Sequence, residues 1–368
     1  MSKDVYKAVI VGFTHVHIPI FAEIFAKNPR INLCAGADIE PIVPELRSAP
    51  CTRLWNMDYC SKKFGIEIWE DWLEMLDRIK PDLCVVNSEN VHHAIITEEC
   101  ARRGIGVCVD KPMATNLSDA LKMYRASVAY NTLLMICWPT ASDPVIHMAK
   151  KLIDDGAVGK IIEVKTRMGH MGPFDWAGSQ FGETGMTDAE MASTWWYQSK
   201  AGGGAMADYC CYGNLIARWF AGAPAVSAIG MRINSKMAMG DAEDNAVMVL
   251  RFHDMYAVLE GTWTTRNHTF QSPIVYGTEG SLVADYMSNQ ITLYRNNGQR
   301  EDIKIDELPP NLHDASTAYV HHMDTGEPLH ELISASFNLD VHAMLDAGIR
   351  SATSGRMELV NNILWQIG

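Results

Sequence analysis

The stretch Gly106-Val107-Cys108-Val109-Asp110-Lys111-Pro112 says more about the fold than any other part of the chain. Residues 106–109 form a short apolar run, which is typical of a strand buried in a parallel sheet. The carboxyl ends of such strands meet at the edge of the sheet where ligands bind. Pro112 favours an extended backbone at Lys111, so we expect this lysine to be held in a defined direction at the ligand edge.

Lys111 has two possible roles on these residues alone. Desolvation beside an apolar sheet weakens the preference of a lysine for its charged form, which would make Lys111 a proton carrier near neutral pH. Alternatively, the side chain extends past the strand end and places its ammonium group in water. The rest of the chain favours the first role.

Up to about residue 137, apolar strands alternate with segments of helical spacing. We expect strands at residues 6–12, 31–37, 83–86, 106–109 and 133–137. Helices are expected at residues 19–27, 54–64, 69–78, 92–103 and 117–129. Repeated strand–helix–strand units with short connections predict a doubly wound parallel sheet of the Rossmann type. This sheet would form an N-terminal nucleotide-binding domain over residues 1–137.

Residues 138–368 follow a different pattern and predict a second, α+β domain for substrate binding and oligomerisation. Alternating strands are expected at residues 161–168, 246–252, 256–264, 272–276, 281–285 and 290–294. Helices are expected at residues 145–155, 215–220, 331–351 and 358–366. These strands predict an open, mostly antiparallel sheet, which can leave one face free for a substrate or a partner subunit. A homo-oligomer through this sheet is therefore expected.

The composition excludes several classes of partner. Apolar residues make up 48% and charged residues 20% of the 368 residues, and the formal net charge is -13. Without a basic run, nucleic acid and anionic membranes are poor candidates. Nine cysteines without a C-x-x-C pair indicate reduced thiols, and the chain shows no signal sequence or long apolar span. We therefore expect a cytoplasmic protein.

The first strand ends in Gly12-Phe13-Thr14-His15-Val16-His17, where a dinucleotide fingerprint G-x-G-x-x-G would stand. Only the first glycine is present, because Thr14 and His17 occupy the other two places. We expect the Thr14 hydroxyl and a side chain of His15 or His17 to donate to the pyrophosphate instead. The alternative is that both histidines have packing or surface roles. A metal site is not expected, since no third ligand is evident.

Asp38 ends the second predicted strand, close to where an acidic residue binds a ribose hydroxyl in such folds. The next residues, Ile39-Glu40-Pro41, contain no lysine or arginine. A 2′-phosphate at this place would meet only negative charge, so we expect NAD rather than NADP.

A second set of chemical groups follows three consecutive glycines at 202–204. Residues 206–220 have helical composition, and the spacing of four residues places Asp208 and Tyr212 on one helix face. A carboxylate and a phenol arranged in this way can grip a substrate with many hydroxyl groups. The alternative is that Asp208 only favours the start of a helix.

The sequence resembles the Gfo/Idh/MocA family over essentially its whole length. Asp110-Lys111-Pro112 resembles the Glu-Lys-Pro motif of the family, and residues 86–93 resemble its cofactor loop, with Asn90 and His93 at the Asn and His positions. Residues 152–160, 203–212 and 276–280 resemble three later segments. Two differences stand out: Cys210 replaces a glycine, and Tyr212 stands where most members have a catalytic histidine. Members similar to glucose–fructose oxidoreductase also have tyrosine there.

The resemblance implies NAD as cofactor and a carbohydrate as substrate. The expected cofactor contacts are Gly12, Phe13, Thr14, His15, Asp38, Ser88, Asn90, His93, Asp110, Lys111, Pro112 and Trp138. The expected substrate contacts are Lys111, His170, Trp176, Trp195, Asp208 and Tyr212, and Trp196 is a further candidate. Each aromatic residue could equally belong to the core.

We therefore expect oxidation of a secondary hydroxyl on a sugar, glycoside or cyclitol by hydride transfer to the nicotinamide. The proton would pass to Lys111 or Tyr212, while Asp208 orients the substrate and biases the charge of the lysine. A tyrosine is a poor base but a good donor, so Lys111 is the leading proton carrier. A hydrolase or lyase that uses NAD transiently is the second possibility, and a non-catalytic NAD sensor is the third.

Overall fold

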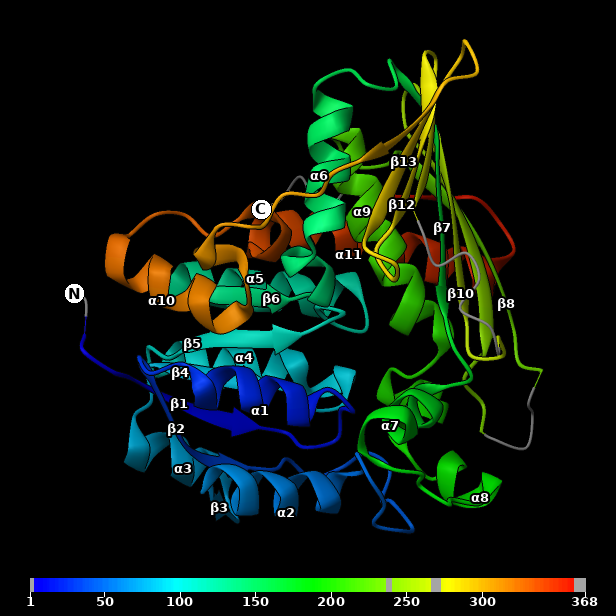
Figure 1. Cartoon of the computed structure of the whole chain (residues 1–368). Coiled ribbons are helices and arrows are strands. Elements are labelled where there is room, and N and C mark those ends of the chain that lie inside the picture. The colour runs from blue at the N-terminus through cyan, green and yellow to red at the C-terminus, as the bar shows by residue number, and fades with distance from the viewer. Residues whose placement is uncertain (1–2, 236–239, 266–272, 361–368) are drawn as a thin grey trace.

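The computed structural model describes residues 3–235, 240–265 and 273–360. Two sheets organise these residues (Figure 1). The first, called sheet A, is six-stranded and parallel, in the order β3-β2-β1-β4-β5-β6. Its strands are β1 (Tyr6–Val11), β2 (Ile31–Ala37), β3 (Glu67–Trp69), β4 (Leu83–Val86), β5 (Gly106–Asp110) and β6 (Leu134–Cys137). This arrangement confirms the predicted doubly wound sheet.

The central strands of sheet A consist of apolar residues because they are covered on both faces. Every residue of β4, β5 and β6 is buried. The connecting helices are α1 (Ile18–Lys27), α2 (Arg53–Phe64), α3 (Trp72–Ile79), α4 (His93–Arg102) and α5 (Leu117–Tyr130). Helix α1 contacts α2, and α4 contacts α5. The carboxyl ends of β1, β4 and β5 therefore meet at one edge, where residues 12–17, 87–93 and 110–112 lie.

One predicted helix in this half begins later than expected. Residues 67–69 pair with β2 as the edge strand β3, so the helix expected over residues 69–78 starts at Trp72. Asp71 is the physical reason, because its carboxylate accepts hydrogen bonds from the backbone N–H groups of Leu73 and Glu74 at 2.7 and 3.1 Å. A carboxylate in this N-cap position fixes the start of a helix.

The second sheet, called sheet B, has nine strands in the order β14-β13-β12-β11-β7-β10-β9-β8-β15. Only β7 and β10 run parallel to each other, so the prediction of a mostly antiparallel sheet is confirmed. The strands are β7 (Ile161–Gly169), β8 (Ser227–Ile233), β9 (Asn245–Arg251), β10 (Tyr256–Thr262), β11 (Ile274–Gly277), β12 (Gly280–Asp285), β13 (Gln290–Arg295), β14 (Arg300–Ile303) and β15 (Glu358–Leu359).

Helices cover one face of sheet B, as Figure 1 shows for α6, α9 and α11. The helices of this half are α6 (Pro144–Asp154), α7 (Pro173–Phe181), α8 (Asp188–Ala192), α9 (Cys211–Ala221), α10 (Ala315–Thr325) and α11 (Ala335–Ser354). Strands β8 and β14 and helices α7, α8 and α10 were not expected. Helix α11 starts after Ser334, whose hydroxyl caps it by accepting from Phe337 N–H at 3.4 Å.

The last helix, expected over residues 358–366, does not begin at residue 358. Residues 358–359 instead pair with β8 as strand β15. Residues 361–366 lie outside the described part of the chain, and so does Ser272, the first residue of the strand expected over residues 272–276.

The two halves of the chain pack against each other. Helix α11 contacts α5, and Trp138 Nε1 donates to Asn338 Oδ1 at 2.7 Å. The proposed boundary between residues 137 and 138 stays a prediction, since helices from the second half pack against the first.

Candidate active site

Lys111 follows directly after β5 and is almost completely buried, with 2% of its surface exposed. Its ammonium group donates to Asp208 Oδ1 at 2.5 Å and to the Asp208 carbonyl oxygen at 3.2 Å. The Lys111 backbone N–H donates to Asp110 Oδ1 at 2.8 Å. His93 supports the turn from behind, since its Nδ1 lies 3.2 Å from the Pro112 carbonyl oxygen. The lysine is therefore held at both ends.

Asp208 lies in a single π-helical turn, Met206–Cys210, that precedes α9. Its second carboxylate oxygen accepts from Trp263 Nε1 at 3.0 Å, a partner that the sequence did not suggest. The glycines before the turn allow this arrangement. Gly204 has φ +117, and a Cβ there would lie 2.4 Å from a carboxylate oxygen of Glu243, which accepts from Met206 N–H. A π-helical turn is often found at functional sites.

Tyr212 lies in the first turn of α9 and faces the same lysine. Lys111 Nζ lies 4.8 Å from the centre of the Tyr212 ring, which contacts Trp138 edge to face at 5.3 Å. Burial raises the pKa of Tyr212 above its usual value, although the Lys111 charge opposes this. The phenol therefore stays protonated at neutral pH and can donate a hydrogen bond.

One expectation about Lys111 is wrong in this structure. Burial alone would lower the pKa of Lys111, but the Asp208 carboxylate holds it well above its usual value. Desolvation is the largest single effect and lowers the pKa, but Asp208 and the other acidic groups around the lysine raise it and together outweigh desolvation. Lys111 is thus an ammonium group, ready to donate rather than to accept a proton.

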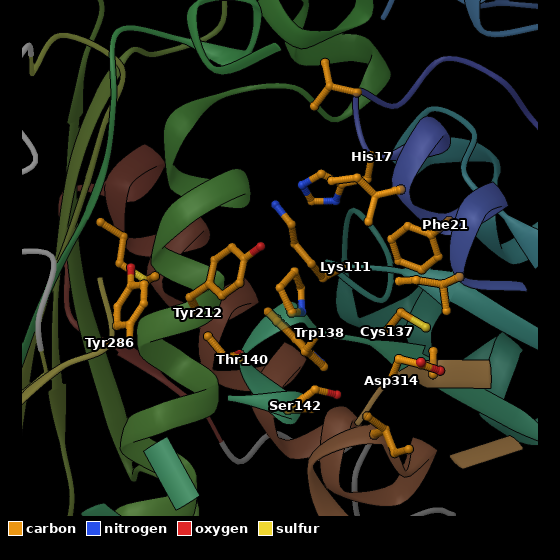
Figure 2. A pocket seen from close by; sticks show the side chains of 18 of the residues that line it. His17, Phe21, Lys111, Cys137, Trp138, Thr140, Ser142, Tyr212, Tyr286 and Asp314 are labelled. Atoms are coloured by element: carbon orange, nitrogen blue, oxygen red, sulfur yellow. The ribbon is translucent and has the colours of Figure 1, made fainter. Parts of the chain in front are cut away.

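Lys111, Asp208 and Tyr212 line a cavity of about 460 Å³ between the edge of sheet A and the start of α9 (Figure 2). Trp138, His170 and Trp176 of the expected residues also line it, as does Trp196. Trp195 does not. It is buried, and its indole N–H donates to the Thr14 carbonyl oxygen at 2.9 Å, so its expected contact with substrate is not supported.

Most of the expected cofactor residues lie together beside this cavity and are buried. Gly12 has φ +90, and a Cβ there would lie 2.5 Å from the Ser88 backbone, so only glycine fits where β1 and β4 end. Asn90 Nδ2 donates to the Gly202 carbonyl oxygen at 2.9 Å. Phe13 is also buried, and its ring lies against Gly36.

The polar groups near the carboxyl edge of sheet A are suited to binding a dinucleotide. Thr14 Oγ1, Asn87 Oδ1, Asn90 Oδ1 and Trp196 Nε1 are buried without a hydrogen-bond partner. Buried polar atoms are normally paired, so three unpaired ones at this sheet edge and a fourth on Trp196, whose ring contacts His15, indicate a polar ligand. When bound, a nicotinamide dinucleotide supplies the hydride chemistry of such a site.

The expectation that only negative charge surrounds Asp38 is wrong. The Asp38 carboxylate forms an ion pair with Arg53 at the start of α2. A 2′-phosphate would therefore not meet only negative charge, as residues 39–41 suggested. Burial raises the pKa of Asp38, against the effect of Arg53. Arg53 was not expected as a partner because it lies at the start of the next helix and not directly after Asp38. Its guanidinium group is already paired with the Asp38 carboxylate.

His15 and His17 also have a partner that the sequence did not reveal. Asp110 Oδ2 lies 3.1 Å from Nδ1 of each histidine. A third group with metal-ligand chemistry is thus present, contrary to the expectation for this loop. The three residues come from the loop after β1 and the end of β5, which adjoin only in the folded sheet. Of the three, His17 lines the cavity.

The fold and this site define a class: oxidoreductases that join a Rossmann sheet to a large, mostly antiparallel sheet. Residues 52–137 match the family described as "Oxidoreductase family, NAD-binding Rossmann fold", and residues 146–283 match the "GFO/IDH/MocA C-terminal domain". The chain belongs to the Gfo/Idh/MocA family of NAD-binding oxidoreductases.

Three relatives are similar in sequence. Levoglucosan dehydrogenase of Pseudarthrobacter phenanthrenivorans is 26% identical, over 61% of this chain and 61% of its own length. The scyllo-inositol 2-dehydrogenase (NAD(+)) of Bacillus subtilis is 25% identical, over 76% and 79%. The 2,7-anhydro-N-acetylneuraminate hydratase of Mediterraneibacter gnavus is 21% identical, over 77% and 73%.

Solved structures show the same fold. The aldose-aldose oxidoreductase from Caulobacter crescentus has a TM-score of 0.76 at 20% identity and covers 96% of this chain and 99% of its own. GenD2 from gentamicin A biosynthesis, in complex with NAD, has a TM-score of 0.74 at 21% identity, covering 98% of each chain. Within the described residues, no helix is both long and apolar enough to cross a membrane.

Proposed function

We propose that the chain is an NAD-dependent dehydrogenase that oxidises a secondary hydroxyl of a sugar, glycoside or cyclitol. One observation carries the proposal: a buried lysine, paired with a carboxylate and adjacent to a phenol, opens onto a cavity at the nucleotide edge of sheet A. Two relatives are named levoglucosan dehydrogenase and scyllo-inositol 2-dehydrogenase (NAD(+)), which supports this substrate class.

The three polar residues have different tasks in this proposal. The Lys111 ammonium donates to the oxygen of the reacting carbon, and Tyr212 adds a second donor. In carbonyl reduction, Lys111 gives its proton to that oxygen. In oxidation, Lys111 must first lose its proton as the pH rises through its pKa, and the neutral amine then takes the hydroxyl proton of the substrate.

The cavity suits a ring with many hydroxyl groups. Its volume of about 460 Å³ lies in the range of small-molecule sites. Aromatic side chains of Trp138, Trp176 and Trp196 line it and offer faces for a pyranose or cyclitol ring, while His170 offers a polar contact.

The test is product analysis by NMR after incubation of the protein with NAD and a panel of substrates. The panel contains free sugars, anhydrosugars, inositols and glycosides. We expect a keto product and a matching amount of NADH from at least one of them. Tight NAD binding with no product from any compound would instead favour a sensor.

A second candidate is a reaction in which NAD is reduced and reoxidised within one turnover. The relative named as a hydratase favours it, because its name describes no net oxidation. The two candidates differ in one measurement. A dehydrogenase accumulates NADH, followed by its absorbance, whereas the second class converts substrate or releases an aglycone while NAD stays constant.

A further inference from the structure

We propose that His15, His17 and Asp110 form a binding site for one Zn²⁺ ion in the wall of the cavity. The three side chains offer two imidazole nitrogens and one carboxylate oxygen, all within 4.8 Å of one another. This is the donor set of zinc sites that have three protein ligands and keep a fourth position open.

The distances match a tetrahedral ion. His15 Nδ1 and His17 Nδ1 each lie 3.1 Å from Asp110 Oδ2. With zinc–ligand bonds of about 2.0–2.1 Å, two ligands of a tetrahedral ion lie roughly 3.3 Å apart. The two distances to Asp110 are therefore close to those of such an ion, and all three ligand atoms lie within 4.8 Å of one another.

Zinc binding would replace hydrogen bonds that the two histidines now make. His15 Nδ1 accepts the backbone N–H of His17 at 3.1 Å, so this nitrogen carries no proton and its one lone pair is used in that hydrogen bond. His17 Nδ1 and Asp110 Oδ2 share a hydrogen bond of 3.1 Å. Binding of the ion would release the His17 N–H from His15 and take the place of the proton between His17 and Asp110.

The charges around Asp110 support the same conclusion. Asp110 is fully buried, and among the ion pairs of the described residues its partners are the two histidines. The ammonium of Lys111 pairs with Asp208 instead. Buried charges are normally paired or coordinate a metal, so a cation beside Asp110 would be favourable.

The groups around the ligands are arranged as in established metal sites. Asn87 Nδ2 donates to Asp110 Oδ2 at 3.0 Å and the Lys111 backbone N–H to Oδ1 at 2.8 Å, which fixes the carboxylate. The side chain of His17 is 15% exposed and faces the cavity near Lys111 (Figure 2). The open position of the ion would take a water molecule or a ligand hydroxyl from this side.

The test measures metal binding and needs no substrate, so it is independent of the proposed function. The full-length chain is stripped with a chelator, incubated with Zn²⁺, dialysed and measured by mass spectrometry of the metal. We expect about one zinc per chain. His17→Ala should weaken the affinity at least about tenfold, measured by competition with a chromophoric chelator. His313→Ala is the matched control, since His313 also lines the cavity, and it should keep the wild-type affinity.

Co²⁺ provides the second measurement. We expect the intense visible absorption of four-coordinate cobalt in the wild-type chain and its loss in His17→Ala. Asp110→Asn, which keeps the size of the side chain, should lose it as well. Circular dichroism confirms that each variant is folded. A folded His17→Ala chain with wild-type zinc affinity, or a wild-type chain that holds no stoichiometric zinc, would overturn the proposal.

Discussion

Lys111 Nζ lies 2.5 Å from Asp208 Oδ1, although the two residues are 97 positions apart in the chain. The contact joins the end of β5 to the helical turn before α9, across the cavity. It also contributes to the charge of the lysine, since the Asp208 carboxylate is the main one of the neighbouring groups that raise the Lys111 pKa against the effect of burial. The chemistry of the site therefore depends on this pair rather than on either residue alone.

The first prediction concerns the lysine itself. Replacing Lys111 with Met keeps much of the apolar stem and removes the proton. We expect kcat to fall by roughly 10²–10⁴-fold, the usual contribution of a positioned acid or base. Steady-state kinetics on a substrate identified by the NMR panel measure this. Lys151→Ala, which removes a surface lysine on α6, is the control. Near-normal turnover in folded Lys111→Met would exclude the central role of Lys111.

The second prediction concerns pH. Asp208 raises the pKa of Lys111, whereas burial lowers it, so Asp208→Asn should lower the pKa of the lysine. Oxidation requires the neutral amine, and its rate therefore rises with pH through that pKa. In Asp208→Asn the rise in kcat/KM should occur at lower pH than in the wild type. The pH profile of kcat/KM for oxidation measures this, and an unchanged profile would contradict the assigned pairing.

The third prediction concerns the choice between NAD and NADP. In Asp38→Ser, the Arg53 guanidinium loses its ion pair at the place where a ribose phosphate would lie. The ratio of NADP affinity to NAD affinity should therefore increase. Calorimetric titration of both cofactors measures it, and the double variant Asp38→Ser/Arg53→Ala should lose the gain. An unchanged ratio in the single variant would show that Arg53 does not reach the phosphate.

The fourth prediction concerns oligomerisation through the uncovered face of sheet B, which we propose as the contact between copies of the chain. Ile229, Val249 and Val258 are neighbours in the strand register, and Ile229 and Val249 are exposed. Met231, on the same strand as Ile229, is 64% exposed. A contiguous apolar face of this kind favours a protein contact.

Light scattering after size exclusion tests this proposal. We expect the wild-type chain to elute as an oligomer and Met231→Glu/Val249→Glu to shift towards the monomer. Tyr130→Glu, at an exposed aromatic residue on α5, is the control and should not shift. A wild-type monomer would contradict the proposal.

The parts of the fold that were predictable depend on consecutive residues. The apolar run of β5 and the glycine after β1 are visible in the sequence because burial and backbone geometry act on single segments. Strand β8 was missed because its exposed side carries Ile229, Met231 and Ile233, so the expected alternation of polar and apolar residues is absent. The start of α3 was misplaced because a three-residue edge strand precedes it.

The sequence by itself determined the alternating architecture and the candidates Lys111, Asp208 and Tyr212, since strand, helix and motif signals lie within short stretches. The tertiary structure alone decided that Lys111 is charged, that Arg53 meets Asp38, and that Asp110 lies between two histidines. The reason is physical. Charge state and ligand geometry depend on groups within a few ångströms, and folding brings those groups together from distant parts of the chain.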